Sequence, residues 1–95
     1  MKIKVRYFTT LRELAGNKEE EMEIKEGSAL ADLIEKIALN YGEDALNYLY
    51  AEGTRVIDPS IQFLVNSVSV SNLQGLKTEL KNGDVVAIIP PVGGG

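Results

Sequence analysis

The chain lacks the two residue types that do most nucleophilic and metal chemistry in enzymes, because none of its 95 residues is a cysteine or a histidine. This absence excludes disulfides, thiolate nucleophiles, imidazole bases and the usual zinc sites. The groups that remain for chemistry are carboxylates, lysines, hydroxyls and the two chain ends. Any site must therefore be built from these.

The densest cluster of carboxylates is the run Glu19, Glu20, Glu21 and Glu23. A general acid and a general base need two carboxylates in different environments, so that their pKa values separate. The alternating pattern around this run predicts an exposed strand face on which all four carboxylates are equally solvated. We therefore predict no catalytic pair here.

Metal and nucleotide sites are not predicted either. Asp32, Glu35 and Asp84 could in principle hold magnesium, but their spacing is generic. No glycine-rich phosphate motif is followed by a helix. We therefore expect this chain to bind no metal and no cofactor of its own.

The last residues, Pro90 to Gly95, form the candidate site. Pro90 and Pro91 favour an extended backbone that leaves the fold in a set direction. Glycine has no Cβ, so the final three residues can enter a channel too narrow for any other residue type. The carboxylate of Gly95 is ionised at neutral pH. The segment suits delivery of that carboxylate into another protein's active site, although an inert flexible tail or an expression remnant is the alternative.

Charge is uneven along the chain and limits its partners. The net charge is −4; the first 18 residues sum to +4 and residues 19–52 sum to −8. A protein without a basic stripe is a poor binder of nucleic acid. The acidic half could meet a basic protein surface, or it could be a solvated face. No apolar run is long enough to span a membrane and the start does not resemble a signal peptide, so a cytoplasmic protein is expected.

Periodicity predicts the first half of the fold. Residues 2–8, "KIKVRYF", alternate as a strand does, with Phe8 on its charged side. A short helix should follow and end near Gly16, and residues 19–25 form a second strand antiparallel to the first. Residues 28–42 form the main helix, with Ser28 as N-cap and Gly42 at its end. Residues 43–53 are weakly helical or looped.

The second half is predicted to be mostly strand. Residues 61–67 form a strand, Asn66-Ser67 allows a tight turn, and residues 68–71 continue as β structure. "KNGD" at 81–84 is a tight turn before the apolar strand 85–89, which should be central in the sheet. One amphipathic helix across one mixed sheet of four to five strands gives an α+β domain over residues 1–89, followed by the tail 90–95.

Four stretches resemble a known family. They are "KVRYFTTLRELAG" at 4–16, "ALADLIEKIALNYG" at 29–42, "FLVN" at 63–66 and "LKNGDVVAIIPPVGGG" at 80–95. Together they resemble the MoaD-like small subunit of molybdopterin synthase, a ubiquitin-like β-grasp sulfur carrier, and more distantly the thiamine-pathway sulfur carrier and ubiquitin. Two features depart from the family: Ser67 stands where glycine is frequent, and the ending is Val-Gly-Gly-Gly, whereas many members have a different small residue before the final pair.

The resemblance implies a function for the tail. An E1-like adenylating enzyme would use ATP and magnesium to adenylate Gly95, and a sulfur donor would then convert the adenylate into a thiocarboxylate. The larger subunit of molybdopterin synthase would use that sulfur to build the dithiolene of molybdopterin. This chain would be the sulfur-carrying, non-catalytic subunit, which leaves open whether it should be counted as an enzyme.

The resemblance also implies surfaces that contact partner proteins. In the tail these are Pro90, Pro91, Val92, Gly93 and Gly94. On the sheet, Phe8, Leu64 and the exposed side of residues 85–89 would form a second patch. Alternatively, Phe8 lies at the end of the sheet and folds over residues 9–15.

Two other functions remain open at this point. A ubiquitin-like modifier would form the same adenylate but pass its acyl group to lysines of target proteins. An inert interaction module with a loose tail would tolerate an extra residue after Gly95.

Overall fold

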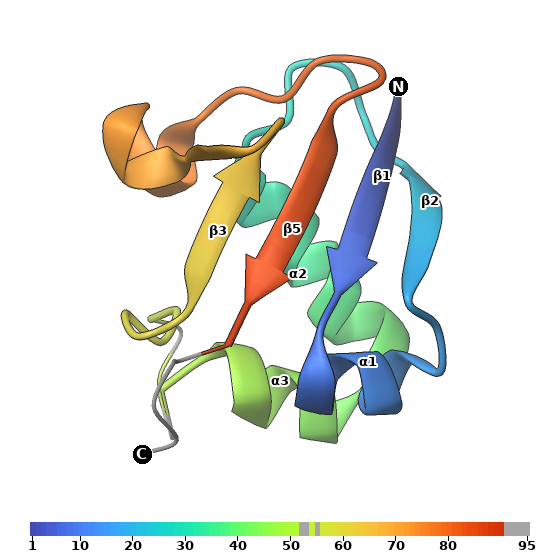
Figure 1. Ribbon diagram of the computed structural model, residues 1–95. Helices are drawn as coiled ribbons and strands as arrows, with labels where there is room; N and C mark the ends of the chain where they lie inside the picture. The colour runs from blue at the N-terminus through green and yellow to red at the C-terminus, as the bar shows by residue number, and fades with distance from the viewer. Residues whose placement is uncertain (52–53, 55, 91–95) are drawn as a thin grey trace.

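A single mixed sheet with its longest helix packed across one face forms the body of the protein (Figure 1). This computed structural model describes residues 1–51, 54 and 56–90. The strands are β1 (Lys2–Tyr7), β2 (Glu19–Glu23), β3 (Gln62–Val65), β4 (Val68–Ser69) and β5 (Val85–Ile89). The helices are α1 (Thr9–Ala15), α2 (Leu30–Tyr41) and α3 (Glu43–Leu49), with short 3-10 turns at Val70–Asn72 and Gly75–Lys77.

The strand order is β2-β1-β5-β3-β4. β1 and β5, the first and last strands, run parallel at the centre, with Lys4 opposite Val85 and Tyr7 opposite Ile88. The other neighbours are antiparallel. The strand predicted to be central is β5, and the mixed sheet confirms the predicted α+β class and the ubiquitin-like β-grasp fold.

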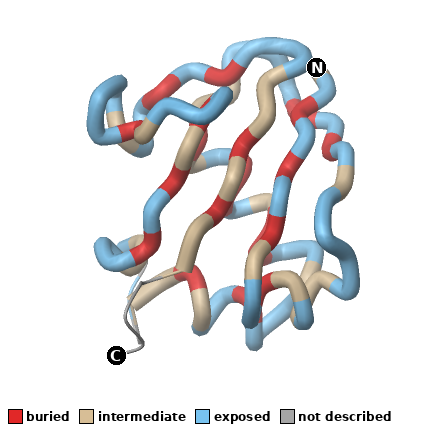
Figure 2. The backbone as a smooth tube through the Cα atoms, in the orientation of Figure 1, coloured by how far each residue is buried: buried red, intermediate tan, exposed pale blue. Residues whose placement is uncertain are grey.

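Alternation along the strands divides core from surface. In β1, Ile3, Val5 and Tyr7 are fully buried while Lys2 and Lys4 are exposed (Figure 2). The apolar stripe of α2 covers the inward side chains of the sheet, because each element has one face to remove from water. The buried apolar core consists of Ile3, Val5, Tyr7, Leu11, Met22, Ile24, Leu30, Leu33, Ile34, Ile37, Ala38, Ala45, Leu49, Ile61, Phe63, Val65, Val70, Leu80, Val86 and Ile88.

The main helix begins later than predicted. Ser28 is not its N-cap: α2 starts at Leu30, and Ala29 occupies the cap position. The Asp32 carboxylate accepts a hydrogen bond of 2.8 Å from the N–H of Ala29, which satisfies a donor at the helix start without a capping hydroxyl.

Gly42 ends α2 as predicted, with φ at 82°. It is also the residue immediately before α3, so one glycine in the left-handed region separates two helices. The segment predicted as weakly helical or looped is therefore a helix over its first seven residues.

Asn66 and Ser67 form a two-residue hairpin loop between β3 and β4. Val65 pairs with Val68, and both loop residues have positive φ, 51° and 70°. This is the primed type of turn that matches the twist of two strands. β4 is shorter than predicted: it stops at Ser69, and the chain enters a 3-10 turn whose residue Ser71 donates its N–H to the Ser69 hydroxyl.

Among the helices that the structure describes, none has the length and apolar character needed to cross a membrane.

Candidate functional site

The base of the tail lies at the end of the central strand. β5 ends at Ile89, opposite Gln62 of β3, and the partly buried Pro90 follows it. Because β1 runs parallel to β5, the chain leaves both strands at the same end of the sheet. The other predicted tail residues, Pro91, Val92, Gly93, Gly94 and Gly95, lie outside the described part of the chain.

A group of apolar side chains lies on the sheet face turned away from α2. We call it the outer-face patch and define it as Leu64, Val85, Ala87 and Ile89, all partly buried. Leu64 stands directly opposite Ala87 in the β3–β5 pairing, so the members of the patch are neighbours. The patch therefore extends along the whole of β5, from Val85 to Ile89, the residue before Pro90. The predicted location of Leu64 and of the outward side of 85–89 agrees with this arrangement.

Charged side chains border the patch on the β1 side. Lys4 pairs with Glu19 at 3.3 Å and Lys2 pairs with Glu21 at 3.8 Å, both on the exposed surface. Arg6 stands between Glu19 and Ala87 in the register, but Glu19 is bound to Lys4. Among the described residues, Arg6 forms no ion pair. It was missed as a candidate, although the alternation of β1 already places it on the outer face.

Phe8 lies beyond the end of β1, where it precedes α1 with an extended backbone. The Arg12 guanidinium lies 5.5 Å from the centre of the Phe8 ring, and its Nε donates to the Tyr7 carbonyl at 3.2 Å. Phe8 thus packs on the short helix, as in the second of the two predicted alternatives. Phe8 and Pro90 nevertheless lie at the same end of the sheet, because they follow the parallel strands β1 and β5.

The prediction of a uniformly solvated acidic strand is wrong for Glu20. Glu20 shares the inward side of β2 with Met22 and is partly buried. Its Oε2 accepts hydrogen bonds from the hydroxyls of Tyr7, at 2.6 Å, and of Tyr41. The two rings meet edge to face with centroids 6.1 Å apart. Burial, and then the Glu20 carboxylate, raise the pKa values of both tyrosines.

Two of the three carboxylates considered for magnesium, Asp32 and Asp84, accept hydrogen bonds within the fold. Asp32 caps α2, and Asp84 accepts hydrogen bonds from the Asn66 amide at 2.9 Å and the Lys81 N–H at 2.8 Å. Within the described ranges, no three metal-ligating side chains come together. What the described surface offers is an apolar patch with a polar border, which is the anatomy of a protein-docking surface.

Comparisons with known proteins agree with this geometry. The model of the ThiS family matches residues 5–95. The molybdopterin synthase sulfur carrier subunit of Chlamydomonas reinhardtii is 36% identical, and small archaeal modifier protein 3 of Haloferax volcanii is 30% identical, in each case over all of both chains. The solution structure of small archaeal modifier protein 1 from Methanosarcina acetivorans superposes with a TM-score of 0.84 at 33% identity, covering 99% of this chain and 96% of that one.

These matches confirm the resemblance drawn from the four sequence stretches. The chain belongs to the ThiS family of ubiquitin-like β-grasp sulfur carriers, and it is MoaD-like.

Proposed function

We propose that this protein is the sulfur-carrying small subunit of molybdopterin synthase, and that the carboxylate of Gly95 is its working group. The observation that carries the proposal is the position of β5. The strand is central in the sheet, hydrogen-bonded on both sides, and leads directly into Pro90 and the glycines. A strand fixed on both sides gives the following segment a rigid base.

The proposed chemistry begins on a partner enzyme. An E1-like enzyme binds ATP and magnesium; a Gly95 carboxylate oxygen attacks the α-phosphorus, and pyrophosphate leaves with the electron pair of the broken bond. The product is a mixed anhydride between Gly95 and AMP. Hydrosulfide supplied by the sulfur donor then attacks the acyl carbon and expels AMP, and loss of the sulfur-bound proton gives a thiocarboxylate on Gly95. This chain contributes the acyl group and its positioning, and the partners contribute the catalytic side chains.

The outer-face patch is the proposed docking surface for these partners. Leu64, Ala87 and Ile89 present apolar area beside the base of the tail, with Arg6 at the border. A partner that covers the patch would hold the tail in a defined direction. The same surface serves the adenylating enzyme and the larger synthase subunit in turn, since both must receive the same terminus.

The experiment is an intact-mass measurement on the chain incubated with its E1-like partner, ATP, magnesium and a sulfur donor. The proposal expects a mass increase equal to the difference between sulfur and oxygen, located by fragmentation at Gly95. Omission of ATP is the control. If the mass stays unchanged while the partner consumes ATP with this chain, the sulfur-carrier function is wrong.

A second function, modification of other proteins, is favoured by the names of two relatives, both small archaeal modifier proteins. The adenylate is the same, but a lysine amine of a target attacks the acyl carbon and an amide forms. Adducts that survive denaturant and reductant on an immunoblot would support this function. If such adducts are absent from cells that contain the adenylated form of this chain, the modifier function is wrong.

A further inference from the structure

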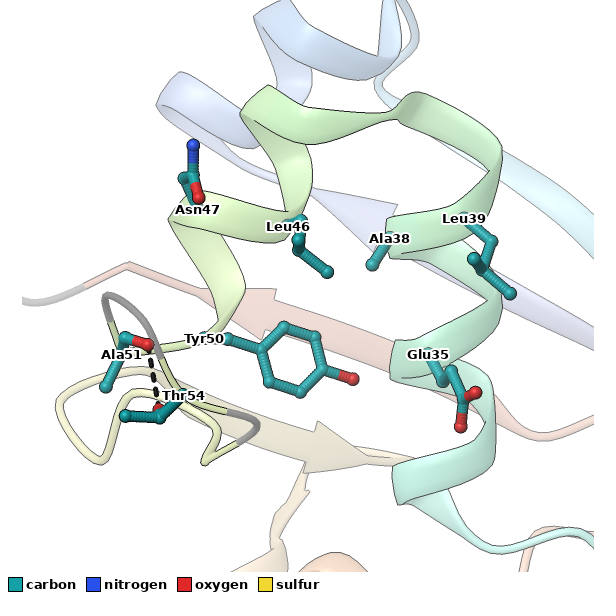
Figure 3. Close-up of a pocket in the computed structure, with 8 residues that line it drawn as sticks. All are labelled: Glu35, Ala38, Leu39, Leu46, Asn47, Tyr50, Ala51 and Thr54. Atoms are coloured by element: carbon teal, nitrogen blue, oxygen red, sulfur yellow. Dashed lines mark hydrogen bonds between the residues drawn. The ribbon is translucent and has the colours of Figure 1, made fainter.

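A groove lies between α2 and α3, on the side of the molecule opposite the outer-face patch. Figure 3 shows Leu46 and Tyr50, from α3 and its end, facing the side chains that α2 presents. The groove has a volume of about 430 Å³. It is lined by Glu35, Ala38, Leu39, Leu46, Asn47, Tyr50, Ala51 and Thr54.

Two leucines at this groove are exposed to an unusual degree. Leu39 is 75% exposed and Leu46 is 44% exposed, although every other leucine and isoleucine of the two helices is buried. Leu39 lies outside the apolar stripe by which α2 packs on the sheet, so it contributes little to the core. Exposed apolar side chains that gather at a hollow mark binding surfaces more often than single scattered ones do.

The border of the groove is acidic. Glu35 lines it, Asp32 lies one turn earlier on the same face of α2, and Glu43 lies one turn before Leu46 on α3. Lys36, the single basic residue of these two helices, donates its Nζ to the Glu23 carbonyl and is therefore engaged with β2. No described lysine or arginine forms an ion pair with these three acids.

We propose that this groove docks a basic, amphipathic helical segment of a partner protein. Apolar side chains of that helix would occupy the space between Leu39, Leu46 and Tyr50, and its lysines or arginines would face the acidic border. A helix laid in an apolar groove is a recurring mode of recognition, and complementary charge sets its orientation. Because the groove and the outer-face patch lie on opposite sides of the molecule, such a partner can bind while another protein covers the patch.

The test uses a synthetic helical peptide of leucines and lysines, with the leucines at helical spacing, titrated into ¹⁵N-labelled protein. The expected result is a set of amide shift changes confined to α2, α3 and residues 50–51. Leu39→Asn should weaken binding at least tenfold. Leu73→Asn is the control, because Leu73 lies outside the groove and is about as exposed as Leu46. This variant should bind the peptide with unchanged affinity. Added salt should weaken binding, since the charges are exposed.

Two further measurements separate the proposal from its alternatives. A peptide with glutamate in place of lysine should not bind; equal binding, shifts centred outside the groove, or an unchanged affinity for Leu39→Asn would each overturn the proposal. Sedimentation of the free protein tests whether a second copy is the occupant: a dimer that Leu39→Asn dissociates would also overturn it. Thiocarboxylation of the Leu39→Asn variant should proceed at the normal rate, so this test is independent of the proposed function.

Discussion

At the scale of single residues, the turn between β3 and β4 explains how the chain accommodates a serine with positive φ. Ser67 has a φ of 70°, which costs an L-residue about 1–2 kcal/mol. Asn66 offsets part of that cost: its amide donates to the Asp84 carboxylate at 2.9 Å, and its oxygen accepts the Val85 N–H at 2.9 Å. The turn therefore also ties β3 to the start of β5.

We expect Ser67→Gly to raise the free energy of unfolding by about 0.5–1 kcal/mol, because the relief of backbone strain exceeds the entropy that glycine adds to the unfolded chain. The matched variant Asn66→Gly should lower it by about 1–2 kcal/mol, since it removes two side-chain hydrogen bonds. Urea unfolding measures both. A destabilised Ser67→Gly variant would show that the turn is held by something other than its backbone conformation.

The cluster of Tyr7, Glu20 and Tyr41 is a second residue-scale feature, and it links β1, β2 and α2. Both phenols donate to one carboxylate oxygen, so the cluster depends on their staying protonated. Burial, followed by the Glu20 charge, raises the pKa of Tyr7 above its ordinary value of 10.0. A tyrosine with a higher pKa in the folded state contributes stability below its unfolded pKa and loses it as the pH rises above that value.

We therefore expect the free energy of unfolding to decline as the pH passes about 10. The Tyr7→Phe variant lacks one hydrogen bond, so its free energy of unfolding near pH 7 should be about 1 kcal/mol lower than that of the parent protein. Above about pH 10 its free energy of unfolding should decline less steeply with pH. Tyr41→Phe, at a more exposed position, is the comparison with a smaller expected effect. Parallel pH profiles for Tyr7→Phe and the parent protein would show that Tyr7 is not the titrating group.

At the scale of elements, the sheet has two faces with different roles. The inner face is covered by α2, while the outer face carries ion pairs at its β1–β2 side and apolar residues at its β5–β3 side. Exposed ion pairs add little to stability. The apolar half is therefore the part that would gain most from being covered by a partner.

Leu64→Ala should weaken binding to the larger synthase subunit by about tenfold, which corresponds to about 1.4 kcal/mol. Gln62→Ala is the matched control, because Gln62 is an exposed residue on the same strand and the same face. Calorimetric titration with that subunit gives both affinities. Equal affinities for Leu64→Ala and the parent would exclude the outer-face patch from this interface.

The elements themselves were mostly predictable from the sequence. A strand buried on one face has alternating apolar and polar residues, as in 2–8 and 19–25, and a strand covered on both faces has a continuous apolar run, as in 85–89. These patterns indicate strands directly. The central position of β5 was indicated by its continuous apolar run. The start of α2 was missed because the cap uses Asp32, not the Ser28 hydroxyl, and α3 was underestimated because its seven residues give only a short apolar pattern.

The sites were only partly predictable. Leu64 and the outward residues of β5 could be placed once the strand register was assumed. Glu20 could have been recognised by counting from Met22, since residues two apart share a face. The groove between α2 and α3 could not be predicted, because its shape depends on how two helices meet at Gly42. The sequence feature that could have indicated the groove is Leu39, an apolar residue of α2 that lies outside the buried stripe of the helix.

At the scale of the whole molecule, the fold presents two separate surfaces. The outer-face patch lies beside the exit of the tail, and the groove lies on the helical side. The proposed working group is a backbone carboxylate, which needs no catalytic side chain from the fold. A working group of this kind is compatible with a member of a sulfur-carrier family that has no cysteine or histidine.

Gly94→Ala should slow adenylation by at least tenfold, since a Cβ would obstruct a channel shaped for glycine, while the free energy of unfolding stays within about 0.5 kcal/mol of the parent value. The readout is pyrophosphate release by the E1-like partner at matched chain concentrations. Leu73→Ala is the control, because it changes an exposed side chain that belongs neither to the tail nor to the outer-face patch. A normal rate for Gly94→Ala would show that the partner's channel accommodates a side chain there.

The most direct test of the central claim is the intact mass of two chains treated in parallel with the E1-like partner, ATP, magnesium and a sulfur donor. One chain ends at Gly95, and the other carries one alanine after it. The account predicts that the first gains the sulfur-for-oxygen mass at Gly95 and that the second gains nothing. Gain by both chains, or by neither, would contradict the claim that the Gly95 carboxylate is the working group.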